Sequence, residues 1–318
     1  MLKLSHRPDL VNIQTAHKEI NAFIHRTPVM RSTSINEIAG CDIHFKCENF
    51  QKIGAFKMRG ASCAGLSLSN EEKEKGLATH SSGNHAQAVA LTAKLMGTKA
   101  YIVMPSNSPE IKKRATAGYG AEITFCEPTI EARKSTLDEV VRQTGATFIH
   151  PYDNYNVICG QATCAKEFHE DITDLDAIMA PIGGGGLMSG TALCTSYMRP
   201  TTRIYGAEPE IVNDAYLSLQ KGEIVKNTRI DTIADGLRTN LSDKTFEIIR
   251  EHVTEIFTVT EQEIVDAMRL IWERMKIIIE PSCSVPLAAL LKNKSSFSGQ
   301  KVGIILTGGN VDLGNLPF

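Results

Sequence analysis

The chain has 318 residues, 42% of them hydrophobic, and its 34 basic and 36 acidic side chains leave a net charge near −2. That composition supplies a large apolar core and gives no electrostatic reason to bind nucleic acid or an anionic membrane. The N-terminal stretch "MLKLSHRPDLVNIQ" has no long apolar run, and no later stretch approaches the length of a membrane span. We therefore expect a soluble, cytoplasmic protein with either two lobes or one large α/β domain.

Eight cysteines are spread along the chain, none of them in a CxxC pair or a cluster with zinc-ligand spacing. Several lie inside apolar stretches, where a reduced cysteine packs as a small hydrophobic residue. The pattern predicts free thiols in a reducing compartment.

Strand-like and helix-like segments alternate along nearly the whole chain. We expect strands at 42–47, 100–105, 121–126, 146–151, 177–183, 203–208 and 302–309, and helices at 85–97, 129–145, 186–198 and 261–276. Two of these helices run into Gly97 and Gly145, which are typical stop signals. The alternation predicts parallel sheets covered by helices on both faces. No repeat, low-complexity tract or long linker interrupts it.

Lys57 lies between two apolar residues, Phe56 and Met58, in "NFQKIGAFKMRGA". Lysine is almost never fully buried without a partner. The residue is therefore either a surface lysine in an apolar context or an amine held in a pocket for chemistry.

Four consecutive glycines, Gly183 to Gly186, follow an expected strand and open an expected helix in "APIGGGGLMSGTA". Nothing in core packing calls for four glycines in a row, since each one costs backbone entropy. Their usual role is to bring backbone N–H groups close to a phosphate at a helix N-terminus, and a tight structural turn is the alternative.

A dinucleotide site is a second interpretation of this loop, because Glu208 follows it by roughly the distance expected of a ribose-binding acid. The G-x-G-x-x-G pattern fails, however, because the third position from Gly184 is Ser189. A nicotinamide enzyme remains an outside alternative.

Two further strand ends carry polar residues. "HSSGNHAQA" places Ser81, Ser82, Gly83, Asn84 and His85 at a strand-to-helix turn, which favours a carboxylate-binding loop over a simple N-cap. "ILTGGNVDL" ends an expected buried strand at Thr307, whose hydroxyl would face a ligand or only satisfy the strand end.

Ten segments in order make the chain resemble the pyridoxal-phosphate-dependent serine/threonine dehydratases, and among them the serine racemase branch. The segments are "HRTPVMRS", "KCENFQKIGAFKMRGA", "SSGNHAQA", "GYGAEI", "GQATCAKE", "GGGGLMSG", "AEPEIVNDAY", "TIADGL", "IEPS" and "TGGNVDL". The resemblance implies the two-domain type II pyridoxal-phosphate fold, like that of the tryptophan synthase β chain. Its large cofactor-binding domain would comprise residues 1–66 and 150–318, and its small domain residues 67–149.

The resemblance also assigns roles. Lys57 would bind the cofactor covalently and act as the base at the substrate Cα, and Ser82 would return a proton on the opposite face. The other implied cofactor contacts are Phe56, Asn84, Gly183, Gly184, Gly185, Gly186, Leu187, Gly236, Glu280 and Thr307. The implied substrate contacts are Ser81, Ser82, Asn84, His85 and Arg133; for Arg133, a solvated helix face is an equally good interpretation.

Two regulatory sites are implied as well. A divalent cation, Mg²⁺ or else Ca²⁺ or Mn²⁺, would be held by the Glu208 and Asp214 carboxylates and the Val212 carbonyl, a hard-ligand set. ATP would bind at a subunit interface of a homodimer, at positions that resemblance alone identifies: Lys52, Gln87, Lys112, Ala115, Tyr119 and Asn310.

The expected activity is racemisation of serine together with loss of water from serine or threonine. The nearest alternative is a dedicated L-threo-3-hydroxyaspartate or threonine ammonia-lyase. A catalytically silent pyridoxal-phosphate or amino-acid-binding protein is the alternative of another class. The expected partner is a small amino-acid substrate.

Overall fold

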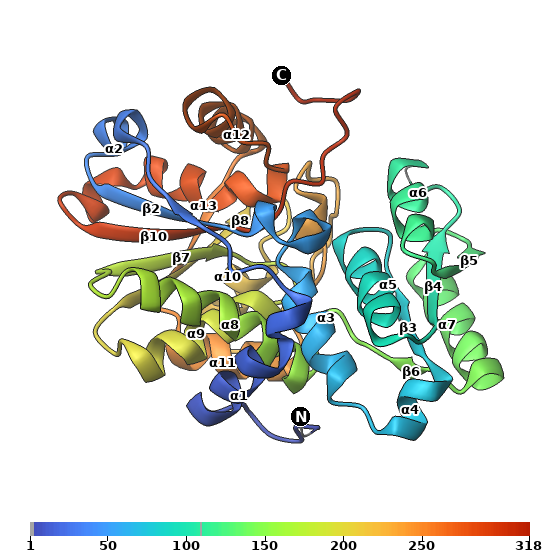
Figure 1. Cartoon of the computed structure of the whole chain (residues 1–318). Coiled ribbons are helices and arrows are strands. Elements are labelled where there is room, and N and C mark those ends of the chain that lie inside the picture. The colour runs from blue at the N-terminus through green and yellow to red at the C-terminus, as the bar shows by residue number, and fades with distance from the viewer. Residues whose placement is uncertain (1–2, 109) are drawn as a thin grey trace.

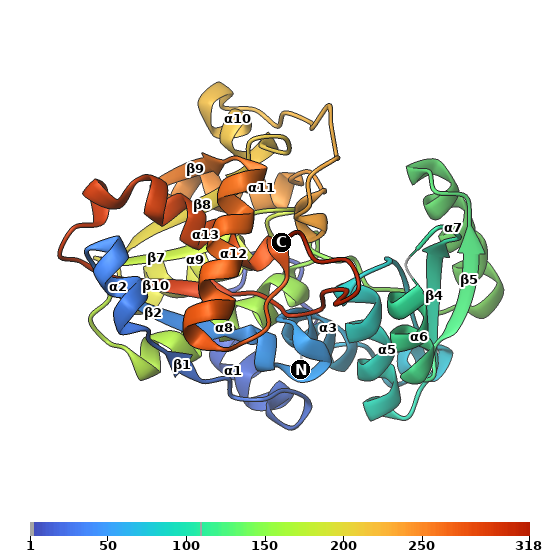
Figure 2. The same ribbon diagram turned by 90° about the horizontal axis from the view of Figure 1, so that it is seen from above.

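Two separate sheets organise the computed structural model, which describes residues 3–108 and 110–318 (Figures 1 and 2). The larger sheet has the strand order β1-β2-β10-β7-β8-β9. Its strands are β1 (Val29–Met30), β2 (Asp42–Cys47), β10 (Lys301–Leu306), β7 (Ala177–Pro181), β8 (Arg203–Pro209) and β9 (Glu255–Val259). All neighbouring strands are parallel except β1 and β2.

The smaller sheet has the order β5-β4-β3-β6 and is parallel throughout. It comprises β5 (Glu122–Cys126), β4 (Ala100–Pro105), β3 (Leu77–His80) and β6 (Thr147–Phe148), so one continuous segment of chain builds it. This sheet and its helices lie to the right in Figure 1, with α3 (Lys57–Leu66) between the two halves.

Helices cover both faces of the larger sheet (Figure 1). On one face lie α1 (Leu10–Ile20), α8 (Tyr155–Asp171), α9 (Gly186–Met198) and α11 (Asp243–His252), and on the other α2 (Thr33–Ala39), α12 (Glu261–Met275) and α13 (Pro281–Lys292). The smaller sheet is accompanied by α4 (Asn70–Lys75), α5 (Asn84–Met96), α6 (Glu110–Gly118) and α7 (Ile130–Thr144). The remaining helix, α10 (Asp214–Lys221), follows β8.

Alternation along the strands divides the core. In β7, Ile178 packs toward α8 and α9, whereas Met179 packs toward α12 and α13, because successive strand residues point to opposite faces. In β4, Ile102 joins the same cluster as Ile178, and Val103 packs with Leu137 of α7 on the outer face. One apolar cluster therefore runs from the larger sheet through α3 and α5 to the smaller sheet.

The prediction of parallel sheets flanked by helices is confirmed, and the expected strands at 42–47 and 100–105 have the bounds that we predicted. Gly97 and Gly145 end α5 and α7 in the left-handed conformation, as expected. The expected strand at 146–151 is wrong beyond residue 148, because the chain leaves the sheet there. No range was predicted for β1, β3 or β9, although a strand end was expected before Ser81, where β3 ends. None of the described helices is long and apolar enough to cross a membrane.

Candidate active site

Lys57 is the first residue of α3, directly beside the end of β10. Phe56 N donates to Thr307 O at 3.0 Å, and Ala55 forms a β-bridge with Gly308. The Lys57 amine lies 5.1 Å from the centre of the Phe56 ring and donates to Pro151 O at 3.0 Å. The lysine and the hydroxyl-bearing strand end, 250 residues apart in the chain, are thus neighbours.

The surroundings of Lys57 favour a neutral amine. Although part of the side chain is accessible to solvent, burial lowers the pKa of the amine from 10.5 to about 8, and the Glu280 carboxylate opposes this shift. Of the two apolar residues that flank Lys57 in the sequence, Phe56 lies close to the amine. Met58 is fully buried in the core, and no recorded contact joins it to the amine.

Glu280 and two asparagines form a hydrogen-bonded group beside this lysine. Asn84 Nδ2 donates to the two Glu280 oxygens at 2.9 and 3.2 Å, and Asn84 Oδ1 accepts from Asn310 Nδ2 at 2.8 Å. Burial, and after it the charge of Asp235, raises the pKa of Glu280 to about 7. Asn84 begins α5 of the smaller half, so this group joins the two halves of the molecule.

At each of the four glycines, neighbouring atoms fill the space that a Cβ would occupy. The expectation that core packing does not require these glycines is therefore wrong. A Cβ on Gly184 would lie 2.2 Å from the Tyr152 ring, and one on Gly183 would lie 3.0 Å from Gly236 O. Gly185 has a φ of +83°, which few other residues adopt. Glycine is required here for close packing and for a turn.

The same loop also fits a phosphate. Among the described residues, nothing accepts a hydrogen bond from the backbone N–H groups of residues 183–188, and the N-cap of α9, Gly185, has no side-chain cap. A row of free N–H groups at a helix N-terminus favours a phosphate dianion.

Three other residues expected to contact the cofactor lie elsewhere in the site. Leu187 is buried in the first turn of α9, and Gly236 N donates to Ser282 Oγ at 3.0 Å. Thr307 is 3% exposed, and its hydroxyl has no hydrogen-bond partner in the described parts of the chain. These groups fit pyridoxal phosphate.

Residues 149–153, which we call the crossover segment, connect the smaller sheet to α8 and contact three parts of the site. Ile149 O accepts from His85 Nε2 at 2.9 Å, Pro151 O accepts from Lys57, and the Tyr152 ring covers Gly184. Sequence reasoning missed the role of Tyr152. Its packing on Gly184 could not be predicted from the local sequence, because the contact joins segments that are 32 positions apart.

The serine loop lies at the turn between β3 and α5. Ser81 Oγ accepts from Gly83 N at 3.2 Å, whereas the Ser82 hydroxyl has no recorded hydrogen bond within the described chain. Burial, and after it the charge of Lys57, lowers the pKa of His85 to about 3, so this imidazole is neutral. The loop adjoins Lys57 through His85, and the proton-returning role of Ser82 stays a prediction.

Arg133 lies on α7, near His80 at the end of β3. Burial, and after it the charge of Arg133, lowers the pKa of His80, and Arg133 Nε is buried without a partner among the described residues. No recorded contact joins Arg133 to the serine loop or to Lys57. Its role as a substrate contact stays a prediction.

The three residues expected to hold a cation lie together at the end of β8. Glu208 accepts from Ala215 N and Tyr216 N at 3.2 and 2.8 Å, and Asp214 accepts from Asn227 Nδ2 and Leu241 N at 2.7 and 2.8 Å. Glu208, Val212 and Asp214 are all buried. Within the described residues no group of three His, Cys, Asp or Glu could hold a metal, so a cation here would depend on carbonyl and water ligands as well.

The six residues expected to bind a nucleotide are only partly connected to the site. Asn310 Nδ2 donates to Ile53 O at 2.7 Å as well as to Asn84, and Lys112 pairs with Asp235. Lys52 Nζ donates to Ala22 O at 3.0 Å. Gln87 is buried on α5, and Ala115 lies on α6.

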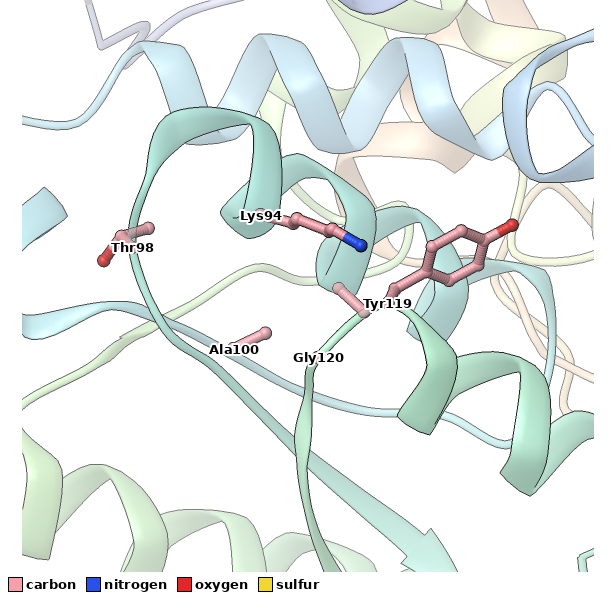
Figure 3. A pocket seen from close by; sticks show the side chains of 6 residues that line it. Lys94, Thr98, Ala100, Tyr119 and Gly120 are labelled. Atoms are coloured by element: carbon pink, nitrogen blue, oxygen red, sulfur yellow. The ribbon is translucent and has the colours of Figure 1, made fainter.

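Tyr119 lines a cavity of about 280 Å³ between α5 and β4. Lys94 extends toward the Tyr119 ring in this cavity (Figure 3). Of the residues that we expected to bind a nucleotide, Tyr119 alone lines it, and Lys57 does not.

Comparisons with known proteins agree with this arrangement. Beta-hydroxyaspartate dehydratase of Paracoccus denitrificans is 48% identical over 98% of this chain and 99% of its own length. Serine racemase of Dictyostelium discoideum is 49% identical over 96% of both chains. The crystal structure of that racemase covers 96% of this chain and 99% of its own with a TM-score of 0.92.

A family model described as pyridoxal-phosphate dependent enzyme matches residues 20–308, which is most of the chain. The lysine, the free N–H row and the buried threonine lie within this range. The chain belongs to the family of pyridoxal-phosphate-dependent enzymes.

Proposed function

We propose that this protein is a serine racemase and serine/threonine dehydratase, which interconverts L- and D-serine and converts L-serine to pyruvate and ammonia. The observation that carries the proposal is that Lys57 and the glycine loop contact the same crossover segment, Lys57 through Pro151 O and Gly184 through the Tyr152 ring. A protein that only carried the cofactor would have no need of an amine poised near neutrality.

The chain's own groups divide the work of holding the cofactor and substrate. The glycine loop would bind the phosphate, Asn84 the ring hydroxyl and Thr307 the ring nitrogen, while Lys57 would attach covalently. When bound, pyridoxal phosphate supplies an electron sink that stabilises the negative charge developing at the substrate Cα. The serine loop would hold the substrate carboxylate.

Lys57, when its amine is neutral, removes the proton from the substrate Cα. Return of a proton by Ser82 on the opposite face would invert the centre, so both enantiomers form. Departure of the β-hydroxyl with one proton removes water, and later addition of water with release of ammonia gives pyruvate. Thr307 is a neutral partner for the ring nitrogen, which would discourage transamination.

We also propose a divalent cation at Glu208, Val212 and Asp214, because no cationic side chain of the described residues pairs with either buried carboxylate. ATP as an activator, a homodimer and a cytoplasmic location remain proposals. The free state of all eight cysteines is consistent with a reducing compartment.

A dedicated L-threo-3-hydroxyaspartate ammonia-lyase is the second candidate. The unpartnered Nε of Arg133 would suit a second substrate carboxylate, and the Paracoccus relative is named for hydroxyaspartate. The two candidates differ in substrate and in the formation of D-serine.

A substrate panel tests both proposals. L-serine, D-serine, L-threonine and L-threo-3-hydroxyaspartate would be given to the holoenzyme, with and without magnesium and ATP, while keto acid and enantiomer are measured. We expect D-serine and pyruvate from L-serine, and we expect Ser82→Ala to abolish D-serine formation while elimination stays measurable. If keto acid forms from L-threo-3-hydroxyaspartate and from none of the other three substrates, the dedicated hydroxyaspartate ammonia-lyase is favoured. A visible cofactor band without any turnover would overturn both, and Lys57→Ala should erase that band.

A further inference from the structure

A fully buried ionic cluster lies on the far side of α3 from the cofactor site. We call it the Arg59 cluster; it consists of Lys46, Glu48, Arg59 and Glu167, each 0% exposed. Arg59 is two residues beyond Lys57, and nothing in the proposed chemistry uses any of the four side chains. Such complete burial of four charges needs a physical reason.

Arg59 makes two forked contacts within this cluster. Its Nε and Nη2 donate to the two Glu48 oxygens at 2.7 and 2.8 Å, and its Nη1 and Nη2 donate to the two Glu167 oxygens at 2.8 and 2.7 Å. Nη1 also donates to Thr163 Oγ1 at 3.1 Å. Glu48 lies just after β2 and Glu167 lies on α8, so one guanidinium joins α3 to two other elements.

Lys46 adds a second cation and makes no hydrogen bond to α3 among the described residues. Its Nζ donates to Glu167 Oε2 at 2.8 Å and to Thr27 O at 2.7 Å. The four side chains are therefore two cations and two anions, and at their edge His17 Nε2 lies 3.0 Å from Glu167 Oε1 and Asp171 Oδ2 lies 3.8 Å from Lys46 Nζ. Because well-packed apolar residues often replace a buried ion pair at no cost in stability, stability alone does not account for it.

Helix geometry connects the cluster to the cofactor lysine. Residues two apart lie about 200° around an α-helix, so Arg59 leaves α3 on the side nearly opposite Lys57. Phe56, at the N-cap, gives α3 no side-chain cap. The backbones are also tightly packed here, since a Cβ on Gly160 would lie 2.4 Å from Arg59 O. Fixing Arg59 fixes the rotation of the first turn and hence the direction in which Lys57 points.

We propose that Arg59 is a positioning residue, which acts through Glu48 and Glu167 to hold the Lys57 amine beside the Phe56 ring and Pro151 O. The inference rests on the proposed role of Lys57. The inference concerns only the direction of the Lys57 side chain, so it does not depend on which amino acid is the substrate.

The test is Arg59→Lys, which keeps the charge and loses the fork. Cofactor capture would be followed by visible absorbance after pyridoxal phosphate is added to apoprotein, across a range of pH. A displaced amine would be less buried, and burial is what lowers its pKa, so we expect the midpoint pH of capture to rise above that of the wild type. The capture rate at pH 8 should fall about tenfold, and kcat should fall similarly while KM changes less than twofold.

Lys46→Met is the matched control, because it removes a charge from the same cluster but no hydrogen bond to α3. It should lower the melting temperature and leave the midpoint pH of capture unchanged. If Arg59→Lys does not fold, Glu48→Gln takes its place, because it removes the charge of one carboxylate that Arg59 contacts while keeping the size of the side chain. We expect the same rise in midpoint pH and the same fall in capture rate from this variant. An unchanged midpoint in the folded fork variant, or an equal shift in Lys46→Met, overturns the proposal. A wild-type protein that captures no cofactor would instead refute the proposed function.

Discussion

A lysine with an ordinary pKa of about 10.4 has almost no neutral amine at pH 7, and only the neutral amine is nucleophilic or basic. With its pKa lowered to about 8, roughly a tenth of Lys57 is neutral at that pH. Burial causes the shift, and Glu280 partly opposes it. Lys57 and Glu280 together therefore set the pH range in which the Lys57 amine is neutral enough to react with the cofactor.

Cofactor capture by the apoprotein should therefore rise with pH and level off above about 8. The Glu280 carboxylate raises the pKa of Lys57, so Glu280→Gln should move the midpoint of this profile to lower pH. The measurement is the rate of increase in visible absorbance at each pH. Glu255→Gln, which changes an exposed carboxylate on β9, should leave the midpoint in place. A midpoint that stays or rises in Glu280→Gln would contradict this electrostatic account.

The strands and helices themselves were largely readable from apolar runs and glycine stops. The strands β1 and β9 were missed, and β1, with two residues, is too short for a period to stand out. The run at 146–151 was predicted too long because Ile149 N still donates to Ala78 O, while Pro151 has no N–H to continue the strand pairing.

For the site, the sequence indicated that the four glycines at 183–186 matter. It did not indicate that Tyr152 packs on them, since tertiary packing alone creates that contact.

The glycine loop offers a test of that packing. Gly184→Ala would place a methyl group 2.2 Å from the Tyr152 ring, so we expect it to lower the free energy of unfolding by about 1–3 kcal/mol and to weaken cofactor affinity. Urea denaturation and a cofactor titration would measure the two effects. Gly118→Ala is the control, because a Cβ at Gly118 meets nothing within 4 Å.

Tyr152→Ala should remove the clash, so the double variant should lose less stability than the sum of the two single variants. Additive losses would mean that the methyl group at position 184 meets some other obstacle. The double-variant cycle thus isolates the contact between the crossover segment and the glycine loop.

At the scale of the whole molecule, the site draws its groups from both sheets. Asn84 and Glu280 are 196 positions apart and meet only because the N-terminus of α5 lies beside the N-cap of α13, across the two halves. Family motifs identified both residues, but no sequence spacing predicts their hydrogen bond. A shared apolar core and a few polar contacts hold the halves together.

The ion pair between Lys112 of α6 and Asp235 is one of these polar contacts. Its side chains are 18% and 39% exposed, so we expect a contribution of at most about 1 kcal/mol. Asp235→Asn should therefore speed amide hydrogen exchange in α6 by about two- to fivefold, as read by mass spectrometry of α6 peptides. Asp231→Asn is the control, because Asp231 pairs with Arg229 within its own loop. Equal exchange in the two variants would mean that the core shared by the two sheets, and not this ion pair, limits the opening of α6.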